Sequence, residues 1–335
     1  MKIGLDVYGG DHAPYEILKG AFSALKENND LEVVLYGKAD VISTEVQNSG
    51  IDPTRIEIVD APLVIDNNES PTVAVKTKKE SSLVKGMMDA KEREDIKAFV
   101  TAGSTGAALA AGILRMGRIK GVLRPALAPI LPTLTGGNVC LVDCGANMDS
   151  KPEYLMQFAV MGSLYMQTVY GIEKPRVALL SVGVEDHKGN ELSKAAFELL
   201  KNSELNFVGN MEARDALTGD YDVIVTDGFA GNVLLKTVEG TAKMVLKMFK
   251  NAIYSRPMAK VGALFMKGAF SELKETMDYN NKGGAPMLGL NKVVVKSHGS
   301  SKETAIKASL LQAYAMAKGN LAQKISDGLR ADISE

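Results

Sequence analysis

The sequence predicts an α/β protein: a Rossmann-like, three-layer α/β/α arrangement around a mostly parallel sheet, with a protruding helical segment. Two observations predict this class. Short apolar runs rich in Val, Ile and Leu alternate with longer helical patterns, and polar, glycine-containing loops follow several of those runs. Strands that alternate with helices pair in parallel through right-handed crossovers. Their ligands are expected at the carboxyl ends of the strands.

Length and composition limit the function classes. With 335 residues, 46% of them hydrophobic and 24% charged, the chain can form one large core or two smaller ones. A formal net charge of -1 argues against a globally basic surface, so we expect no nucleic-acid partner. Cys140 and Cys144 share one apolar run and are expected to be small buried side chains rather than a disulfide or metal pair. This usage, and the lack of a signal-peptide pattern, predict a cytoplasmic protein.

The N-terminal part follows the alternation closely. In order, the sequence predicts a strand at 2–7, a loop at 9–14, a helix at 15–27, strands at 32–36 and 55–59 with a helix between them, an acidic loop at 65–71 and a helix from residue 81. The most regular unit runs from Ile96 to Gly117. It contains a strand, a loop at 103–106 and a small-residue helix.

The C-terminal part continues the pattern. Further strands are predicted at 139–142, 176–182, near 207, at 223–225 and at 292–296. The strand at 223–225 leads into a tight loop at 226–232 and then into a helix. Tyr154–Ile172 carries no charged residue, but polar residues and glycines interrupt it. We therefore expect a buried helix there rather than a membrane span.

We expect residues 1–335 to form a single two-lobed α/β catalytic domain with a helical insertion at 243–281. Within this insertion Met258, Val261 and Phe265 recur at helical spacing. Two interpretations stay open from the pattern alone. The apolar face packs against the protein or a dimer mate, or it rests on a membrane surface.

The strand-end loops indicate the chemistry. The fingerprints of dinucleotide, nucleotide-triphosphate, serine-hydrolase and zinc-protease sites are missing. What remains is a set of loops with small donors, among which Lys188 is the outstanding cation. Backbone amides and an ammonium group suit a phosphate or an oxyanion without a metal. His12, His187 and His298 all lie in such loops, where a hydrogen-bonding role is favoured over a general base, and no ligand spacing connects them.

Motifs along almost the whole chain resemble the acyl-acyl-carrier-protein:phosphate acyltransferase family of bacterial phospholipid synthesis. They are, in the family's order, YGGDHAP, VKTKKESS, AGSTGA, RPALA, DCGAN, VEDHKGNE, TDGFAGN, GGAPMLGLN and VKSHGSS. Two departures are mild. Ser104 stands where the family usually has Asn, and Tyr8 lies in VYGGD where the family commonly reads AMGGD.

The resemblance implies transfer of a fatty acyl group from acyl carrier protein to inorganic phosphate, without cofactor or metal. It implies catalytic roles for Lys188, which would hold phosphate, and Asn232, which would stabilise the oxyanion. The glycines of TDGFAGN would make room for phosphate. The implied phosphate- and substrate-binding residues are Gly103, Ser104, Thr105, Gly106, Asp143, Asn147, Asp227, Gly228, Gly231 and His298.

The resemblance also implies partners and a location. It implies a fold similar to phosphotransacetylases and isocitrate/isopropylmalate dehydrogenases, a homodimer, peripheral membrane association, and delivery of the acyl phosphate to a membrane glycerol-3-phosphate acyltransferase for phosphatidic acid synthesis. The membrane-facing residues would be Met258, Val261, Leu264 and Phe265. Two basic clusters are candidates for docking the acidic carrier, namely Lys76, Lys78 and Lys79, and Arg115, Arg118, Lys120 and Arg124. A solvated surface is the alternative interpretation of each cluster. The alternatives are an acyl-coenzyme A phosphotransacylase and a non-catalytic membrane-associated scaffold.

Overall fold

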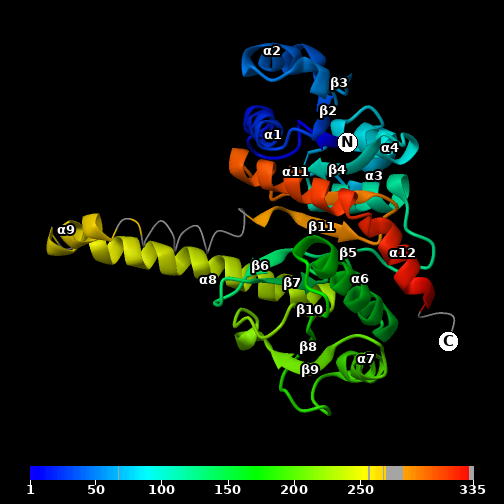
Figure 1. Cartoon of the computed structure of the whole chain (residues 1–335), viewed down its shortest axis with the longest axis vertical. Helices are drawn as coiled ribbons and strands as arrows, with labels where there is room; N and C mark the ends of the chain where they lie inside the picture. The colour runs from blue at the N-terminus through cyan, green and yellow to red at the C-terminus, as the bar shows by residue number, and fades with distance from the viewer. Residues whose placement is uncertain (67, 256, 267, 269–281, 332–335) are drawn as a thin grey trace.

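The computed structural model describes residues 1–66, 68–255, 257–266, 268 and 282–331. It confirms the predicted α/β class, and its strands form two mostly parallel sheets (Figure 1). The first sheet belongs mainly to the N-terminal part of the chain, and the second belongs to the middle part. Whether the chain counts as a single two-lobed domain stays a prediction.

The first sheet has seven strands in the order β3-β2-β1-β4-β12-β11-β5. Their bounds are β1 (Lys2–Asp6), β2 (Glu32–Gly37), β3 (Ile56–Asp60), β4 (Ile96–Thr101), β5 (Ala126–Leu127), β11 (Ala285–Leu288) and β12 (Val293–Lys296). All neighbours pair in parallel except β11, which is antiparallel to both β12 and β5. Strand β12 therefore returns from the far end of the chain to lie beside β4, and their carboxyl ends meet at one edge.

The second sheet has five strands in the order β6-β7-β10-β8-β9. Their bounds are β6 (Ile130–Pro132), β7 (Asn138–Val142), β8 (Val177–Ser181), β9 (Phe207–Glu212) and β10 (Val223–Val225). Only β6 runs antiparallel to its neighbour. The central strand β10 is buried along its whole length, which explains its uninterrupted Val-Ile-Val sequence.

Helices cover the sheets. Their bounds are α1 (Tyr15–Glu27), α2 (Ala39–Ser49), α3 (Pro71–Thr77), α4 (Ser82–Glu92), α5 (Thr105–Ala111) with its continuation η2 (Gly112–Met116), α6 (Pro152–Tyr170), α7 (Glu191–Lys201), α8 (Gly228–Tyr254), α9 (Pro257–Phe265), α11 (Glu303–Lys318) and α12 (Leu321–Ala331). The short turns are η1 (Pro53–Arg55) and η3 (Ala213–Asp215). Helix α6 is the predicted charge-free helix, and most of its middle is buried.

One apolar core joins the two sheets. A single buried cluster contains Leu5 of β1, Phe158 of α6, Leu179 of β8 and Leu310 of α11. Helix α6 contacts α11 and α12 as well as strands of the second sheet. Burial of these side chains therefore couples the two sheets, and the space between their strand ends has fixed walls.

The structure differs from the sequence prediction in several elements. Strands β5, β6 and β11 and helices α3, α7, α11 and α12 have no counterpart among the predicted elements. The loop predicted at 226–232 is wrong in extent, because α8 already begins at Gly228 after the N-cap Asp227. The expected nature of the cysteines is confirmed, since Cys140 and Cys144 are both buried and neither forms a disulfide.

The long helix α8 projects from the body and carries α9 near its tip (Figure 1). Its 27 residues leave the second sheet at Gly228 and end at Tyr254. Residues 269–281 of the predicted insertion lie outside the described residues, as do the side chains of Val261 and Leu264. No helix in the described part of the chain combines the length and apolar content needed to span a membrane.

Candidate functional site

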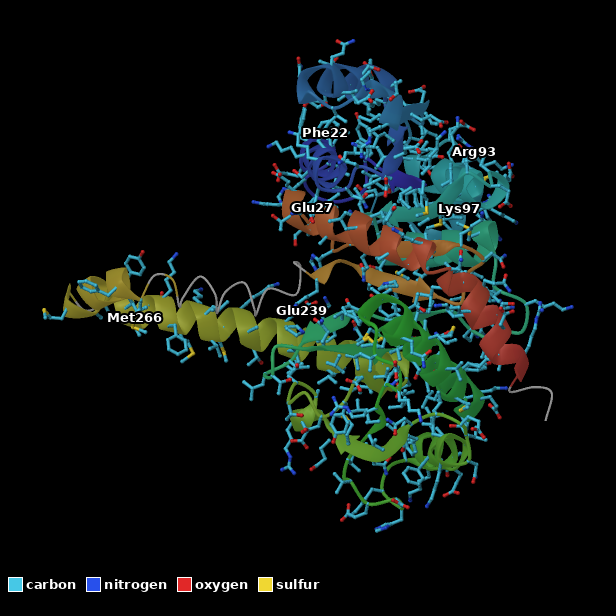
Figure 2. All side chains as sticks on the ribbon, viewed as in Figure 1. Phe22, Glu27, Arg93, Lys97, Glu239 and Met266 are labelled. Atoms are coloured by element: carbon cyan, nitrogen blue, oxygen red, sulfur yellow. The ribbon has the colours of Figure 1, made fainter. Side chains whose placement is uncertain are left out.

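A cleft of about 210 Å³ lies between the two sheets at the base of α8. The start of α5, the segment between β5 and β6, the base of α8, the segment entering β11 and the end of β12 all contribute to its lining. Sites of this kind are expected where the carboxyl ends of parallel strands meet. Figure 2 labels Glu239, one of the lining residues, near the point where α8 leaves the body.

One wall of the cleft is apolar. Its side chains come from the β5–β6 region and from the inner face of α8, and they are Leu127, Pro129, Ile130, Leu131 and Leu235. Such a wall suits a hydrocarbon chain, since contact with it removes apolar surface from water.

The second wall is polar, and three of its residues come from α8. Asn232, Lys236 and Glu239 are spaced by four and three residues, which places them on one helix face. Lys236 Nζ lies 2.8 Å from Glu239 Oε2. Asn232 lies against the backbone of Gly145, since a Cβ atom added at Gly145 would be 3.7 Å from Asn232 Oδ1.

The end of β12 supplies Lys296, whose side chain is buried within this polar wall. Its Nζ donates hydrogen bonds to the carbonyl oxygens of Ala102 and Ser297, which leaves one N–H for a ligand. Burial lowers the pKa of Lys296 to about 8, with Lys236 acting in the same direction and Asp6 and Asp11 opposing. Lys296 is therefore protonated at neutral pH and close to its titration range.

His298 follows two residues later and also lines the cleft. Its Nδ1 accepts a hydrogen bond from the Ser300 backbone N–H at 3.2 Å, so the neutral ring carries its proton on Nε2. Burial lowers the pKa of His298, and the nearby Lys236 lowers it further. The ring is thus neutral at physiological pH and can donate from Nε2.

The buried carboxylate of Asp6 links the ends of strands β1 and β4. Asp6 Oδ2 accepts a 2.7 Å hydrogen bond from Thr101 Oγ1, and Thr101 Oγ1 accepts one from the Gly103 N–H at 3.0 Å. Burial raises the pKa of Asp6, although its hydrogen bonds act against this. Asp6 therefore ties β1 to β4 next to the loop that leads to Thr105 in the cleft.

Asp143 and Asn147 shape the loop behind Asn232, and neither belongs to the cleft lining. The Asp143 carboxylate accepts hydrogen bonds from the backbone N–H groups of Leu127, Ala146 and Asn147 and from the Asn147 side chain, at 2.7–3.2 Å. Burial raises the pKa of Asp143 against these bonds. Its hydrogen-bonding capacity is used inside the protein, so the geometry supports a role in positioning the loop.

The glycines at the start of α8 have a packing role in the structure. A Cβ atom at Gly228 would lie 2.5 Å from the Asn147 carbonyl oxygen, and one at Gly231 would lie 1.9 Å from that of Asp143. They allow α8 to approach the 143–147 loop closely, and that they also make room for phosphate stays a prediction. Asp227 accepts hydrogen bonds from the N–H groups of Phe229 and Ala230, both at 2.9 Å, as the N-cap of α8.

The 103–106 loop is brought to the cleft only in part. Thr105 lines the cleft, whereas Ser104 Oγ accepts a hydrogen bond from the Ala107 N–H as the N-cap of α5. Gly103 lies near Asp6, and Gly106 allows close contact with Pro71.

Lys188 and Asn232 are not brought into one cleft. Lys188 is exposed on the loop between β8 and α7, where its N–H donates to the Glu185 carbonyl at 3.0 Å. It is absent from the lining of the cleft that contains Asn232. A separate hollow near this loop is lined by Gly189, Asn190, Asp227 and Ala230, so the first turn of α8 separates the two.

The cleft also contains a cysteine that is a poor nucleophile. Burial raises the pKa of the Cys144 thiol well above its ordinary value, so the thiol stays protonated. Among the described residues, no group of three or more His, Cys, Asp or Glu side chains could hold a metal ion.

Sequence reasoning missed Lys236, Glu239 and Lys296. Lys236 and Glu239 carry a signal, since they continue the helix face of Asn232 at spacings of four and three residues. Lys296 ends a strand pattern in which a polar residue is usually solvated. Its burial depends on neighbours that are distant in sequence.

The chain is similar to known proteins in sequence and in fold. A model of the family described as "Fatty acid synthesis protein" matches residues 1–324. The chain is 47% identical to the phosphate acyltransferase of Clostridium acetobutylicum over 97% of this chain and 98% of that protein. It is 49% identical to that of Bacillus pumilus over 93% of each.

Solved structures show the same fold. A phosphotransacetylase from Streptococcus pyogenes aligns with a TM-score of 0.61 at 19% identity, covering 95% of this chain and 94% of the other. A branched-chain phosphotransacylase from Enterococcus faecalis aligns with a TM-score of 0.58 at 15% identity, covering 94% and 99%. At these identities the likeness concerns the fold alone.

Proposed function

The chain belongs to the family of fatty acid synthesis proteins that includes the phosphate acyltransferases, and we propose that its acyl donor is acyl carrier protein and its acceptor inorganic phosphate. It is an acyltransferase. The observation that carries the proposal is the cleft at the base of α8, whose lining includes both apolar side chains and a set of cations and hydrogen-bond donors. An acyl chain fits the first wall and an oxyanion fits the second.

The reaction needs no covalent enzyme intermediate. An oxygen of hydrogen phosphate attacks the thioester carbon, the carbon–sulfur bond breaks, and the proton of the phosphate ends on the sulfur. The products are an acyl phosphate and a free thiol, so atoms and charge balance. The protonated Cys144 thiol is consistent with direct transfer.

We assign Asn232 to the oxyanion that forms at the thioester carbon. It lines the cleft beside the backbone of Gly145 and has an amide N–H₂ group that can donate. Lys188 stays a proposed catalytic residue. Because it is exposed on the loop between β8 and α7, its role requires that loop to approach the substrate from outside the cleft.

The carrier would dock on the basic residues of the two clusters. Arg115 Nη2 donates to the carbonyl oxygens of Val75 at 2.9 Å and Lys76 at 3.4 Å, so the two basic clusters adjoin in the structure. Lys76, Lys79 and Arg118 are exposed there, whereas Lys78 is paired with Glu69 at 2.6 Å. Arg124 stacks over the Tyr154 ring at 5.8 Å. Two basic clusters that adjoin at Arg115 suit an acidic partner.

We further propose a homodimer that rests on a membrane through the tip of the α8–α9 arm and passes its product to a membrane acyltransferase that uses glycerol 3-phosphate. The supporting observation is exposure, since the side chains of Met258 and Phe265 are 82% and 89% exposed. Isolated exposed apolar side chains are common, but their concentration at the end of a projecting helix suits an interfacial role.

The test is phosphate-dependent release of thiol from acyl carrier protein, with direct detection of acyl phosphate. We expect turnover that depends on both phosphate and the carrier thioester. A matched assay with acyl-coenzyme A separates the related phosphotransacylase activity, and a preference for that thioester would overturn the choice of donor. Absence of turnover with both thioesters would favour the alternative function, a non-catalytic membrane-associated scaffold.

A further inference from the structure

Among the residues that line the cleft, the lysines outnumber the carboxylates. Lys236 and Lys296 both line it, together with the donor Nε2 of His298. Glu239 is the carboxylate among the lining residues, and it already contacts Lys236 at 2.8 Å. Lys296 is nearly fully buried, at 6% exposure, and the carboxyl groups that favour its charge, Asp6 and Asp11, lie outside the lining. A buried ammonium beside an open cleft is costly unless an anion can meet it.

The three donors come from two elements that hold them rigidly. Lys236 lies on the first turns of α8, whose approach is fixed by Gly231 against the Asp143 carbonyl. Lys296 and His298 follow β12, where the Ser297 N–H donates to the Thr101 carbonyl oxygen at 2.8 Å. The Lys296 ammonium uses two of its three N–H bonds on the carbonyl oxygens of Ala102 and Ser297.

We propose that Lys236, Lys296 and His298 form the binding site for the phosphate acceptor, and that Glu239 occupies the Lys236 ammonium when phosphate is absent. This inference rests on the proposed function and specifies where its acceptor binds. One phosphate oxygen accepts from the free N–H of Lys296, a second from His298 Nε2, and a third from Lys236 after it leaves Glu239. Phosphate bound here lies in the same cleft as Asn232, in position to attack a thioester carbon held along the apolar wall.

The role of Glu239 has a distinct consequence. Its carboxylate is 7% exposed and competes with phosphate for the same ammonium. Replacing it with glutamine keeps the shape but removes the negative charge, so it should strengthen phosphate binding. Replacing either lysine should weaken binding.

The test measures binding of inorganic phosphate to the full chain by calorimetry, without acyl substrate. Lys236→Met is expected to raise the dissociation constant for phosphate by roughly 10- to 100-fold, the loss of one charge-assisted hydrogen bond. Lys296→Met is expected to act in the same direction, and Glu239→Gln to lower the constant roughly threefold or more. Lys247→Met is the matched control, because Lys247 is exposed farther along α8 and does not line the cleft.

Lys236 is half-exposed, so its variant is expected to fold even where replacement of the buried Lys296 does not. Unchanged phosphate binding in Lys236→Met, or weaker binding in Glu239→Gln, would overturn the site. The proposed function fails in a different way, through absence of turnover in the unmodified chain. Binding of pantetheine 4′-phosphate without binding of inorganic phosphate would also overturn the inference, since the site would then recognise the donor.

Discussion

At the scale of single residues, Asn232 and Lys188 occupy different surroundings and should respond differently to replacement. Asn232→Ala removes a donor inside the cleft. We expect the chain to fold normally and the turnover number to fall by the equivalent of about 3–4 kcal/mol of transition-state stabilisation. Steady-state assays of acyl phosphate formation measure this. Wild-type turnover in the purified variant would contradict the assignment.

Lys188→Ala addresses the second proposed catalytic residue. If the loop between β8 and α7 reaches the substrate, activity falls by orders of magnitude while phosphate binding in the free enzyme changes little, because Lys188 lies outside the cleft lining. Comparing the turnover number with the phosphate dissociation constant separates this outcome from that of Lys236→Met. The neighbouring exposed His187→Ala serves as a control for disturbance of the loop.

The pKa of Lys296 predicts a pH dependence. Burial lowers this pKa to about 8, while Asp6 and Asp11 on the β1 side raise it and Lys236 on α8 lowers it. Lys296 is charged below that pH, so anion affinity is fully present there and is lost as pH rises through about 8. Between pH 7 and 9 we expect roughly a fivefold to tenfold loss.

Sulfate is the suitable probe for this profile, because its charge stays constant over the range whereas that of phosphate does not. The lowered pKa of His298 keeps that ring neutral across the same interval. A flat sulfate profile in the unmodified chain would show that Lys296 does not contribute its charge to anion binding.

At the scale of elements, the contact between α8 and the 143–147 loop sets the geometry of the site. Gly231→Ala places a Cβ atom 1.9 Å from the Asp143 carbonyl oxygen, so the backbone must shift. We expect a loss of about 1–3 kcal/mol of stability, measured by urea unfolding, together with lower activity.

Gly240→Ala is the matched control on the same helix. A Cβ atom there meets nothing within 4 Å, and alanine is favoured over glycine in a helix by about 1 kcal/mol. The control is therefore expected to be as stable as the unmodified chain or more so. Equal effects of the two substitutions would show that the close approach at Gly231 does not matter.

Elements with a strong local pattern could be predicted from the sequence. Helix α1 begins and ends at the predicted residues, Tyr15 and Glu27, because Pro14 introduces it and its apolar spacing is regular. The two-residue strand β5 has no such pattern, since its extended form depends on pairing with β11. Local sequence cannot specify a partner that follows more than a hundred residues later.

Some residues of the site could be predicted from the sequence, and the surroundings of others could not. Asn232 belongs to a recognisable motif, and the structure places it in the cleft. Asp143 also belongs to a motif, but its carboxylate accepts from the Leu127 N–H, a contact that only the tertiary fold creates. Glu239 has the pattern of a solvated helix residue, and its burial follows from tertiary contacts at the base of α8.

At the scale of the whole molecule, the α8–α9 arm should decide membrane association. Phe265→Asp and Met258→Asp each put a charge on a side chain that is 89% or 82% exposed at the tip. We expect both to reduce flotation with anionic phospholipid vesicles and to leave activity on soluble acyl carrier protein unchanged, because the tip lies far from the cleft (Figure 2).

Leu134→Asp is the matched control on the body. Leu134 is also 89% exposed, and it lies on the turn between β6 and β7. Its replacement should leave flotation intact. Loss of flotation in this variant, or full flotation in both tip variants, would contradict a membrane contact through the arm.

Helix α8 carries Asn232, Lys236 and Glu239 near its start, and the tip of the arm lies at its other end. The length of α8 therefore sets the distance between the site and the tip. A rise of about 1.5 Å per residue puts Tyr254 roughly 27 Å from Lys236. With the tip on lipid, as proposed, the length of α8 would set the greatest distance between the chemistry and the bilayer. Inserting one residue into α8 would turn the tip by about 100° as well as lift it, whereas seven residues, close to two full turns, would change mainly the height.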